Sequence, residues 1–303
     1  MIDSLDKSIL NELGLNCRAS YQKIAEKYNV SATAVKKRVE KLIQSGVIVE
    51  FIIEFNLAMI DGEFFLAEIN TDSSILEEEF IDNLGSNEMI SEVGALTGGA
   101  FIAFGSYIGS EDLREMGKFL RTQESVEDVE IHTLLFPKGK KFQLKNLHLK
   151  VLKCLIDDPR IPVTKIAKKT GLAARTVSRA IDEILESQSV RLSIRWNLNA
   201  VDSITFLSKI TWNEGKTDLD GIMKWLRREF PVEFWEPLIS ADSPIMFPAF
   251  VVESLRDVEV ITRKLQNAEF VESVVTLIGK PSRSFYDLRR YRLDDLLKTT
   301  SYH

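Results

Sequence analysis

The sequence contains two divergent copies of one pattern, and this duplication limits the fold more than any other feature. Residues 8–43 align with residues 150–185 at an offset of 142 positions, with leucine, isoleucine, alanine and valine at matching places. Residues 126–138 align with residues 271–283 at an offset of 145 positions. Because similarity at a fixed spacing is typical of repeated structural units, we expect one architecture to occur twice.

The first part of each copy has the pattern of three helices followed by a strand. In the first copy, Ser20 and Ser31 precede runs whose apolar residues recur every three to four positions, as N-cap residues do. Gly46 follows the third run, as expected for a glycine just past a helix end. Residues 47–56 are rich in the β-branched and aromatic residues typical of strands. This order predicts a winged helix-turn-helix (HTH) domain.

The second part of each copy alternates between strand and helix patterns. In the first copy the order is strand, helix, strand, strand, helix, strand, over residues 64–70, 74–85, 89–96, 101–107, 111–122 and 126–136. The second copy repeats this order and ends with a strand over residues 271–278, which indicates a ferredoxin-like βαββαβ fold. Pro248, inside the strand expected over residues 245–252, indicates an edge position or a bulge.

The predicted fold class is therefore α+β, with two winged HTH domains and two ferredoxin-like domains in tandem. The expected boundaries, in that alternating order and followed by a C-terminal tail, are residues 1–56, 57–137, 138–198, 199–280 and 281–303. The tail has a helical pattern over residues 285–297 and no counterpart in the first copy. It could dock on a sheet, mediate assembly, or contact phosphates through Arg289, Arg290 and Arg292.

The charges are distributed unevenly along the chain. The formal net charge is −6, yet residues 51–137 carry −15 and residues 138–197 carry +9. Such asymmetry suggests a polyanionic partner for the basic block. The alternative is surface charge that differs between domains without a common cause.

The outer side of each predicted recognition helix is basic and polar. An HTH domain places this side in the major groove, where side chains reach base edges and phosphates. In the first copy we expect Thr33 and Lys36 to reach bases, Lys37 and Lys41 to contact phosphates, and Lys23 to touch the flanking backbone. In the second copy the matching DNA-binding residues are Arg175, Ser178 and Arg179, with Lys168 and Lys169 on the preceding helix. Solvated helix faces without a ligand are the competing interpretation.

No catalytic or metal-binding pattern is visible, so we expect neither an enzyme nor a cofactor. His132, His148 and His303 lie far apart in the sequence, with no cysteine or carboxylate at a recognised ligand spacing. Cys17 and Cys154 lie in apolar helical surroundings and are interpreted as small hydrophobic residues. With no apolar run of membrane-spanning length and an acidic N-terminal segment, a soluble cytoplasmic protein is expected.

The first HTH segment resembles the DNA-binding domain of the Lrp/AsnC family, the feast/famine transcription regulators. The resemblance rests on Asp6, Arg18-Ala19-Ser20, Ala25, the run from Ser31 to Arg38, and Gly46-Val47-Ile48. The second copy is similar at Arg160, Ala167, Gly171-Leu172 and the run from Thr176 to Arg179, with Ala173 in place of the capping serine. The resemblance implies a regulator whose partner is double-stranded DNA.

The family pairs through its βαββαβ sheets and often binds an amino acid near them. Members usually carry one copy per chain, so the resemblance implies an intramolecular pseudo-dimer here, with a homodimer of whole chains as the alternative. The family's sensing turn lies between the two central strands, which places a small-molecule effector, such as an amino acid, at Thr97, Gly98 and Gly99 and at Asp242 and Ser243. The acidic residue common in that turn is absent from the first copy and shifted in the second.

Two other functions compete with regulation. Siroheme decarboxylases share this two-part fold and occur as fused pairs, but they need His and Arg after the wing, and residues 47–64 contain neither. An architectural DNA-binding or interaction protein, whose second HTH domain serves only for packing, is the third class.

Overall fold

The computed structural model describes residues 2–201 and 203–299 and divides them into two compact units. The sheet unit comprises residues 63–136 and 197–285, and the HTH unit comprises residues 2–62, 137–196 and 286–299. Each unit therefore collects equivalent parts of the two sequence copies.

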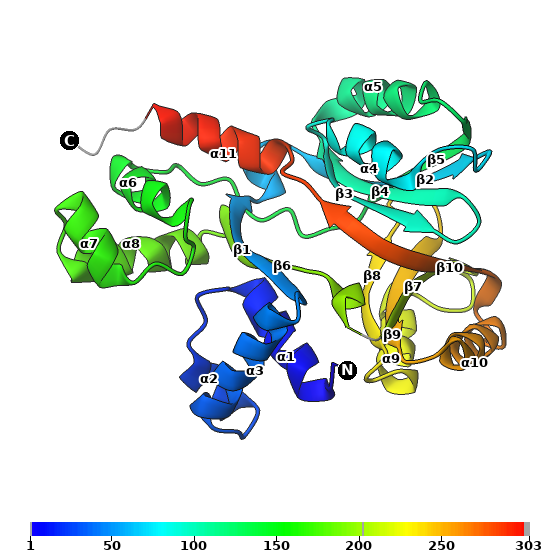
Figure 1. Cartoon of the computed structure of the whole chain (residues 1–303), viewed down its shortest axis with the longest axis horizontal. Coiled ribbons are helices and arrows are strands. Elements are labelled where there is room, and N and C mark those ends of the chain that lie inside the picture. The colour runs from blue at the N-terminus through cyan, green and yellow to red at the C-terminus, as the bar shows by residue number, and fades with distance from the viewer. Residues whose placement is uncertain (1, 202, 300–303) are drawn as a thin grey trace. The chain divides into compact units, whose positions relative to one another are not determined.

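The HTH unit contains two three-helix groups, each followed by a strand (Figure 1). The first has α1 (Ser4–Leu15), α2 (Tyr21–Lys27), α3 (Ala32–Gln44) and β1 (Ile48–Phe55); the second has α6 (Asn146–Leu155), α7 (Val163–Thr170), α8 (Ala174–Glu186) and β6 (Val190–Trp196). A short 3-10 turn at Leu57–Met59 follows β1. Both predicted serine caps are confirmed, since Ser20 and Ser31 accept hydrogen bonds from the backbone N–H groups of Lys23 and Ala34. Gly46 has a φ of 75° just past α3, as its predicted place after the helix requires.

The two HTH groups are joined by an antiparallel ribbon of β1 and β6, which pairs from Ile48 opposite Trp196 to Phe55 opposite Val190, with a register shift between Ile48 and Glu50. A C-terminal helix, α11 (Leu288–Lys298), packs on β1 and α6. The tail therefore docks on the strand that follows the first HTH group.

The sheet unit consists of two βαββαβ halves, as predicted. The first half has β2 (Glu63–Thr71), α4 (Glu77–Gly85), β3 (Ile90–Leu96), β4 (Ala100–Tyr107), α5 (Gly109–Arg121) and β5 (Val126–Leu134). The second half begins after a 3-10 turn at Leu198–Ala200 and has β7 (Ile204–Trp212), α9 (Leu219–Glu229), β8 (Phe234–Ile239), β9 (Ile245–Val252), α10 (Leu255–Gln266) and β10 (Val271–Ser284). Together they form one eight-stranded sheet in the order β5-β2-β4-β3-β10-β7-β9-β8.

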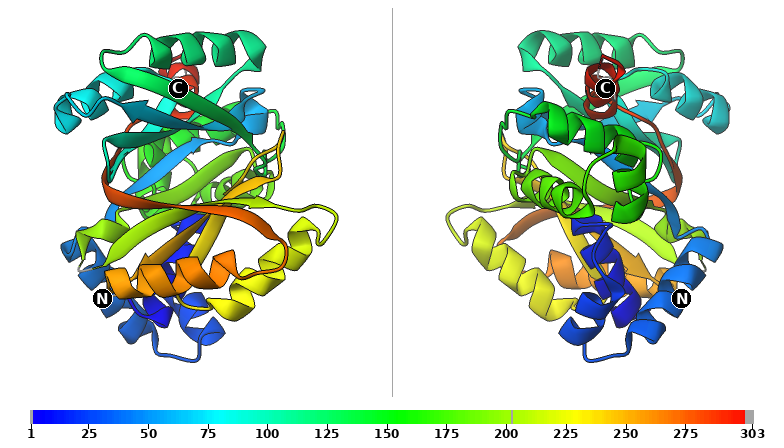
Figure 2. Two further views of the ribbon diagram at one scale, coloured as in Figure 1. Left: turned by 90° about the vertical axis from the view of Figure 1, so that its right-hand side faces the viewer. Right: turned by 90° about the vertical axis from the view of Figure 1, so that its left-hand side faces the viewer.

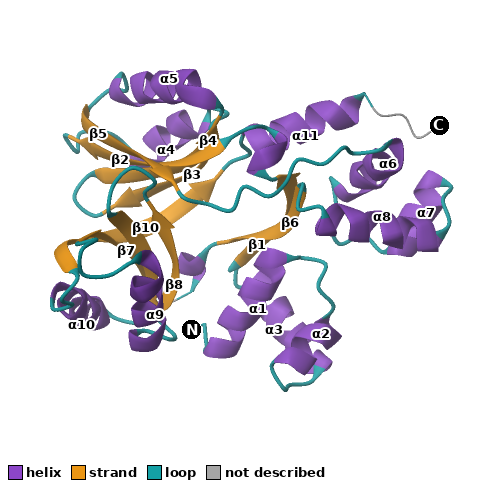
Figure 3. Cartoon of the chain, turned by 180° about the vertical axis from the view of Figure 1, so that it is seen from behind, coloured by secondary structure: helices purple, strands orange, loops and turns teal. Residues whose placement is uncertain are grey.

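Each half buries its own apolar core beneath its two helices. Alternation along β2 directs Phe65, Ala67 and Ile69 into the core under α4 and α5. Phe206 and Ile210 of β7 enter the corresponding core under α9 and α10. The two helix pairs lie on opposite sides of the sheet unit, with the strands between them (Figure 2, Figure 3). The other residues of β2 and β7 therefore face away from these cores.

The halves contact each other in two places: in the middle of the strand order, where β3 meets β10, and between the two end strands, β5 and β8. The backbone N–H of Thr97, in the turn after β3, donates to the carbonyl of Ile278 on β10 at 3.0 Å. In the equivalent place, the N–H of Ala241, in the turn after β8, donates to the carbonyl of Thr133 on β5 at 2.8 Å. The two contacts relate the halves by an approximate twofold symmetry.

β10 is longer than its pattern predicts. The sequence indicates a strand over residues 271–278, but β10 continues to Ser284 and pairs with β3 from Gly279 onward, with a register shift on the way. The extension is polar and contains a proline, so no apolar alternation marks it in the sequence. Its partner strand comes from the other half, which local patterns do not reveal.

The edge position that Pro248 suggests is wrong, and the irregularity beside Pro248 lies in the partner strand β8. β9 lies between β7 and β8, so it is an interior strand. The pairing of β8 with β9 shifts register between Phe234 and Pro237, and Pro237 is paired with Pro248. Two prolines, neither with an N–H to donate, thus face each other beside the irregularity.

Candidate nucleic-acid interface

The first recognition helix, α3, has one buried face and one exposed basic face. Val35, Val39 and Leu42 are buried, as the i, i+4, i+7 pattern predicts. The five residues expected to meet DNA in this copy are all exposed: Thr33, Lys36, Lys37 and Lys41 on α3, and Lys23 on α2. The exposed side of α3 thus has the composition and accessibility that phosphate and base contacts need.

Few acidic partners occupy these lysines. Lys36 Nζ lies 3.8 Å from Glu40 one turn along α3, a pair in which both side chains are more than half exposed. Such exposed pairs contribute little to stability. Within residues 2–201 and 203–299, no ion pair involves Lys37 or Lys41. Their ammonium groups are therefore available to an external anion.

The second recognition helix, α8, repeats this arrangement with arginines. Val177, Ala180, Ile181 and Ile184 are buried, whereas Arg175, Ser178 and Arg179 are exposed, as are Lys168 and Lys169 on α7. Ala173 begins α8 without a side-chain cap. Both HTH groups thus present an exposed cationic helix, one with lysines and the other with arginines.

Arg179 already has an intrahelical partner. Its Nε donates to Glu183 Oε1 at 2.8 Å, while the Arg179 side chain stays 81% exposed. The buried His148 accepts the Lys145 N–H at Nδ1, so its Nε2 carries the proton and donates to Glu183 Oε2 at 2.9 Å. These hydrogen bonds lower the pKa of Glu183 from 4.5 to about 2, and the hydrogen bond from Arg179 has the largest effect. Glu183 thus ties α6 to α8 and orients Arg179.

The arginines at equivalent positions 18 and 160 join the two HTH groups to each other. Arg18 Nη1 donates to the backbone carbonyls of Pro159 and Ile161 at 2.6 and 3.0 Å. Arg160 Nη1 donates to the Tyr21 hydroxyl at 2.8 Å, and its guanidinium lies 4.7 Å from the centre of that ring. The arginines that carry part of the family resemblance therefore hold the HTH unit together.

A second motif pair also has a structural role. Arg38, on the inner side of α3, donates to Asp3 at 2.7 Å and to Asp6 at 2.8 Å, which fixes α1 against α3. These hydrogen bonds raise the pKa of Arg38 above its ordinary value. Arg38 therefore serves to hold the helices of the first HTH group together.

The arginines of the tail have different surroundings, and two of them are not suited to phosphate contacts. Arg289 is buried and donates to Glu54 at 2.7 Å and to Asp287 at 2.8 Å. Arg290 pairs with Asp294 at 2.9 Å and stacks on the Tyr286 ring. Arg292 alone of the three is exposed. The structure shows the tail helix docked on β1 and α6 of the HTH unit, whereas the sequence suggested docking on the ferredoxin-like sheet.

The predicted effector residues lie in the two turns that contact the opposite half of the sheet. Gly98 and Gly99 have φ values of 85° and 79°, which explains why glycine occupies both positions. Asp242 accepts a hydrogen bond from Ser240 at 2.5 Å, and Ser240 also bonds Ser243. A groove of 520 Å³ lies between α10 and β10, and none of the five predicted effector residues is among the described residues that line it.

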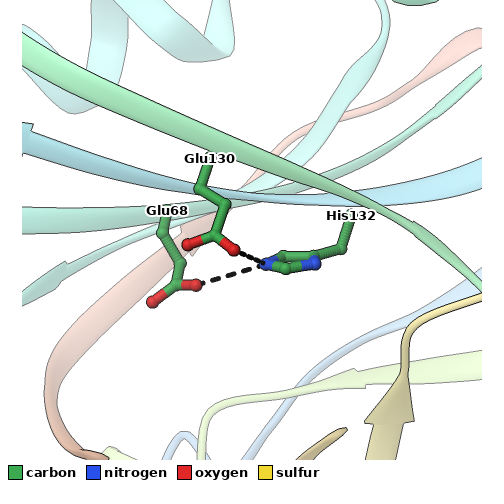
Figure 4. Close-up of side chains that lie close together, drawn as sticks. All are labelled: Glu68, Glu130 and His132. Atoms are coloured by element: carbon green, nitrogen blue, oxygen red, sulfur yellow. Dashed lines mark hydrogen bonds and ion pairs between the residues drawn. The ribbon is translucent and has the colours of Figure 1, made fainter. Parts of the chain in front are cut away.

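One polar cluster in the sheet unit was not predicted from the sequence (Figure 4). His132 Nε2 lies 3.4 Å from Glu68 Oε1 and 3.2 Å from Glu130 Oε1. The expectation that no carboxylate lies at ligand spacing from a histidine is therefore wrong for His132. Alternation along β5 places residues 130 and 132 on one face, which was a usable signal, but Glu68 comes from β2 through cross-strand pairing.

Lys209 of the second half enters the same cluster. Its Nζ lies 2.6 Å from Glu68 and 2.5 Å from Glu130, so an ammonium already holds the position that a metal ion would take among these carboxylates. Burial alone would raise the pKa of Glu68, but hydrogen bonds from His132 and Lys209 bring it below its ordinary value. Burial likewise opposes the charge of Lys209, yet Glu130 and Glu68 raise its pKa.

The cysteines are packed as small apolar residues, as predicted. Both are buried, and burial raises the pKa of Cys17 to about 12, which keeps its thiol protonated. No described helix combines the length and the apolar character needed to cross a membrane.

Comparison with known families identifies both HTH segments. Residues 2–43 match the AsnC-type helix-turn-helix domain, and residues 144–187 match a winged helix-turn-helix DNA-binding domain. A stretch of 56 residues of the chain is 46% identical to the HTH-type transcriptional regulator LysM of Saccharolobus solfataricus, and a match of the same length and identity is found with LrpA of Bacillus subtilis. These matches cover 18% of this chain and 39% and 41% of the two regulators, so the chain spans about two fifths of their length.

A longer match extends beyond the HTH segment. An HTH-type transcriptional regulator of Pyrococcus abyssi, PYRAB04820, is 28% identical over 148 residues, which is 48% of this chain and 99% of that protein. One copy of the duplicated pattern thus corresponds to a whole regulator of this kind.

Among solved structures, the fold is similar to that of the siroheme decarboxylase NirDL. The TM-score is 0.57 at 13% identity, and the match covers 97% of this chain and 98% of that one. At this identity the likeness concerns the fold alone. The chain carries two HTH domains, the first of them of the AsnC type, and is related to the HTH-type transcriptional regulators of the Lrp/AsnC family.

Proposed function

We propose that this chain is a sequence-specific transcriptional regulator that binds double-stranded DNA with α3 and α8 in the major groove. The observation that carries the proposal is that both helices bury an apolar face and expose a cationic one. Exposed lysines and arginines beside threonine or serine are the side chains that contact phosphates and base edges. The relatives named above are transcriptional regulators, which supports the same function.

The two recognition surfaces differ, so we propose an asymmetric binding site. Lysines dominate the exposed face of α3, whereas arginines, the commonest readers of guanine, dominate α8. A homodimer of identical HTH domains would favour a palindrome. One chain acting as an intramolecular pseudo-dimer, which the pairing of β1 with β6 supports, favours two unlike half-sites.

Two matched double variants test this assignment. Lys36→Ala/Lys37→Ala and Arg175→Ala/Arg179→Ala should each weaken binding to a selected duplex, and each should reduce the salt dependence of binding by about two charges. Fluorescence anisotropy at several salt concentrations measures both. Lys118→Ala/Arg121→Ala, which removes two exposed cations from α5, is the control and should change neither. Unchanged affinity for the α8 variant would instead assign the second HTH domain to packing.

We further propose that a small molecule acts through the sheet unit. The groove between α10 and β10 has a volume of 520 Å³, which suits a small ligand, and the backbone carbonyl of Ile278, one of its lining residues, accepts the Thr97 N–H. Calorimetric titration with the standard amino acids tests this. Heat of binding that disappears in Thr262→Trp, which fills the groove, would support an effector site there, and no heat with any of them would exclude this class.

The fold likeness to NirDL keeps one enzyme function under consideration. The described sheet unit has a single histidine, His132, and it is buried and engaged with Glu68 and Glu130. Its burial disfavours a catalytic role for it. Adding siroheme and recording the Soret band decides the matter, because a regulator that does not bind siroheme leaves the spectrum unchanged.

A further inference from the structure

We propose that complementary charges make the pairing of the two sheet halves heterotypic: each half pairs with the other kind of half and not with a copy of itself. The half formed by β2–β5 with its helices is half A, and the half formed by β7–β10 with its helices is half B. This inference concerns the sheet unit alone and stands whether or not the chain binds DNA.

The central observation is that equivalent positions carry opposite charges and contact each other. Residues 64–70 of half A align with residues 205–211 of half B, and this alignment matches Glu68 with Lys209. In the structure the Lys209 ammonium lies 2.6 Å from Glu68 and 2.5 Å from Glu130. A position that meets its own equivalent across an approximate twofold axis would meet an identical residue in a homodimer.

Pairing of half A with another half A would be unfavourable. Glu68 stands directly opposite Glu130 in the β2–β5 register, a like-charged pair that is destabilising unless a cation offsets it. Two such halves would bring four carboxylates together and supply no lysine. The side chains of Glu68 and Lys209 are only 15% and 17% exposed, so water would screen this repulsion poorly.

Pairing of half B with another half B would also be unfavourable, because half B has no carboxylate at these positions to neutralise Lys209. The positions of half B that match Glu130 and His132 hold Val275 and Leu277, so two lysines would meet with no carboxylate between them. In the observed pairing, the Lys209 Nζ and the His132 ring centre instead lie 5.9 and 5.2 Å from the ring centre of Phe247 of half B.

At the seam between β3 and β10, half A again contributes acidic residues and half B basic ones. Lys280 and Arg283 of β10 form ion pairs with Glu77 and Asp82 of α4, and Ser282 donates to Glu92 at 2.6 Å. The opposite seam is closed by backbone hydrogen bonds, such as that of the Leu135 N–H to the Ile239 carbonyl. Acidic residues of half A therefore meet basic residues of half B in two places, the seam between β3 and β10 and the cluster of Glu68, Glu130 and Lys209.

A charge swap at the central pair tests the proposal in the full chain. Lys209→Glu places three carboxylates together, one fewer than in pairing of half A with itself, and should lower the midpoint of thermal unfolding by roughly 5 °C or more. Glu68→Lys should lower it less, because Glu130 remains to offset one lysine. The double variant Glu68→Lys/Lys209→Glu restores two acids and one base and should recover most of the loss. Lys209→Met, which removes charge without reversing it, is the control and should fall between wild type and Lys209→Glu.

Hydrogen exchange locates the effect. In Lys209→Glu the amides at the two seams, including those of Thr97 and Ala241, should exchange at least about ten times faster, whereas amides of the β1–β6 ribbon should not change. A double variant no more stable than Lys209→Glu, or a Lys209→Glu chain as stable as Lys209→Met, would overturn the proposal. Stoichiometric binding of Zn²⁺ by the wild-type chain would also overturn it, because Lys209 could not then be the counter-cation of these carboxylates.

Discussion

Arg18 and Arg160 contact the opposite HTH group, whereas Arg175 and Lys37 face outward. All four residues lie in basic HTH segments of the sequence. Only helical periodicity indicates that Arg175 and Lys37 are on exposed helix faces. Periodicity works within one helix because it reports which face is apolar. It cannot reveal that a loop arginine reaches a carbonyl 141 residues away. For this reason the recognition helices were predictable and the cross-contacts were not.

Arg289 gives a first prediction at this scale. Arg289→Met removes the nearest cation from the buried carboxylates of Glu54 and Asp287 and leaves Glu54 with Arg191 at 3.9 Å. Removing one partner of a buried ion pair costs about 3–5 kcal/mol. Urea unfolding should show a loss of that order. The exposed Arg292→Met is the control and should stay within about 0.5 kcal/mol of wild type. A loss below about 1 kcal/mol for Arg289→Met would contradict the role assigned to the tail.

Glu183 gives a prediction about pH. Its pKa falls from 4.5 to about 2 in the fold, so the charged carboxylate stabilises the native state above about pH 4.5, and this stabilisation is lost as the pH falls through about 2. Glu183→Gln should therefore lower the unfolding midpoint near pH 6, and its difference from wild type should shrink near pH 3. Thermal unfolding at the two pH values measures this. A difference that stays constant with pH would show that the lost contacts do not depend on the carboxylate charge.

At the scale of elements, the capping of the two recognition helices differs. Ser31 caps α3 through a hydrogen bond to the Ala34 N–H at 3.1 Å, whereas Ala173 leaves the N-terminus of α8 without a side-chain cap. Both features are visible in the sequence because an N-cap acts within three residues. The extension of β10 and the Glu68–Glu130–His132–Lys209 cluster are not visible in the sequence, because each depends on strands that pair across long stretches of chain.

The caps predict opposite effects of exchanging serine and alanine. Ser31→Ala should cost about 1 kcal/mol, and Ala173→Ser should stabilise the chain by about 0.5–1 kcal/mol. Denaturant unfolding of both variants measures the two changes. Ala174→Ser, one position inside α8, cannot form the cap and serves as the control. Destabilisation by Ala173→Ser would mean that the start of α8 does not have the geometry of an N-cap.

At the scale of the whole molecule, duplication within one chain gives independent copies that can diverge. Equivalent positions now hold Lys37 and Arg179 on the recognition helices, and Glu68 and Lys209 in the sheet. Two identical subunits cannot carry such differences, because any change appears in both. The repeat in the sequence was sufficient to predict the tandem architecture, but the pairing of opposite charges at equivalent positions became visible only in the fold.

We propose that α3 and α8 bind one DNA duplex together. The most direct test is to select binding sites for the purified full chain from random double-stranded DNA at low ionic strength. The selected duplex is then titrated with increasing salt. The account predicts a site with two unlike half-sites and an affinity that falls steeply as salt rises. The absence of a complex with any duplex under these conditions would contradict it.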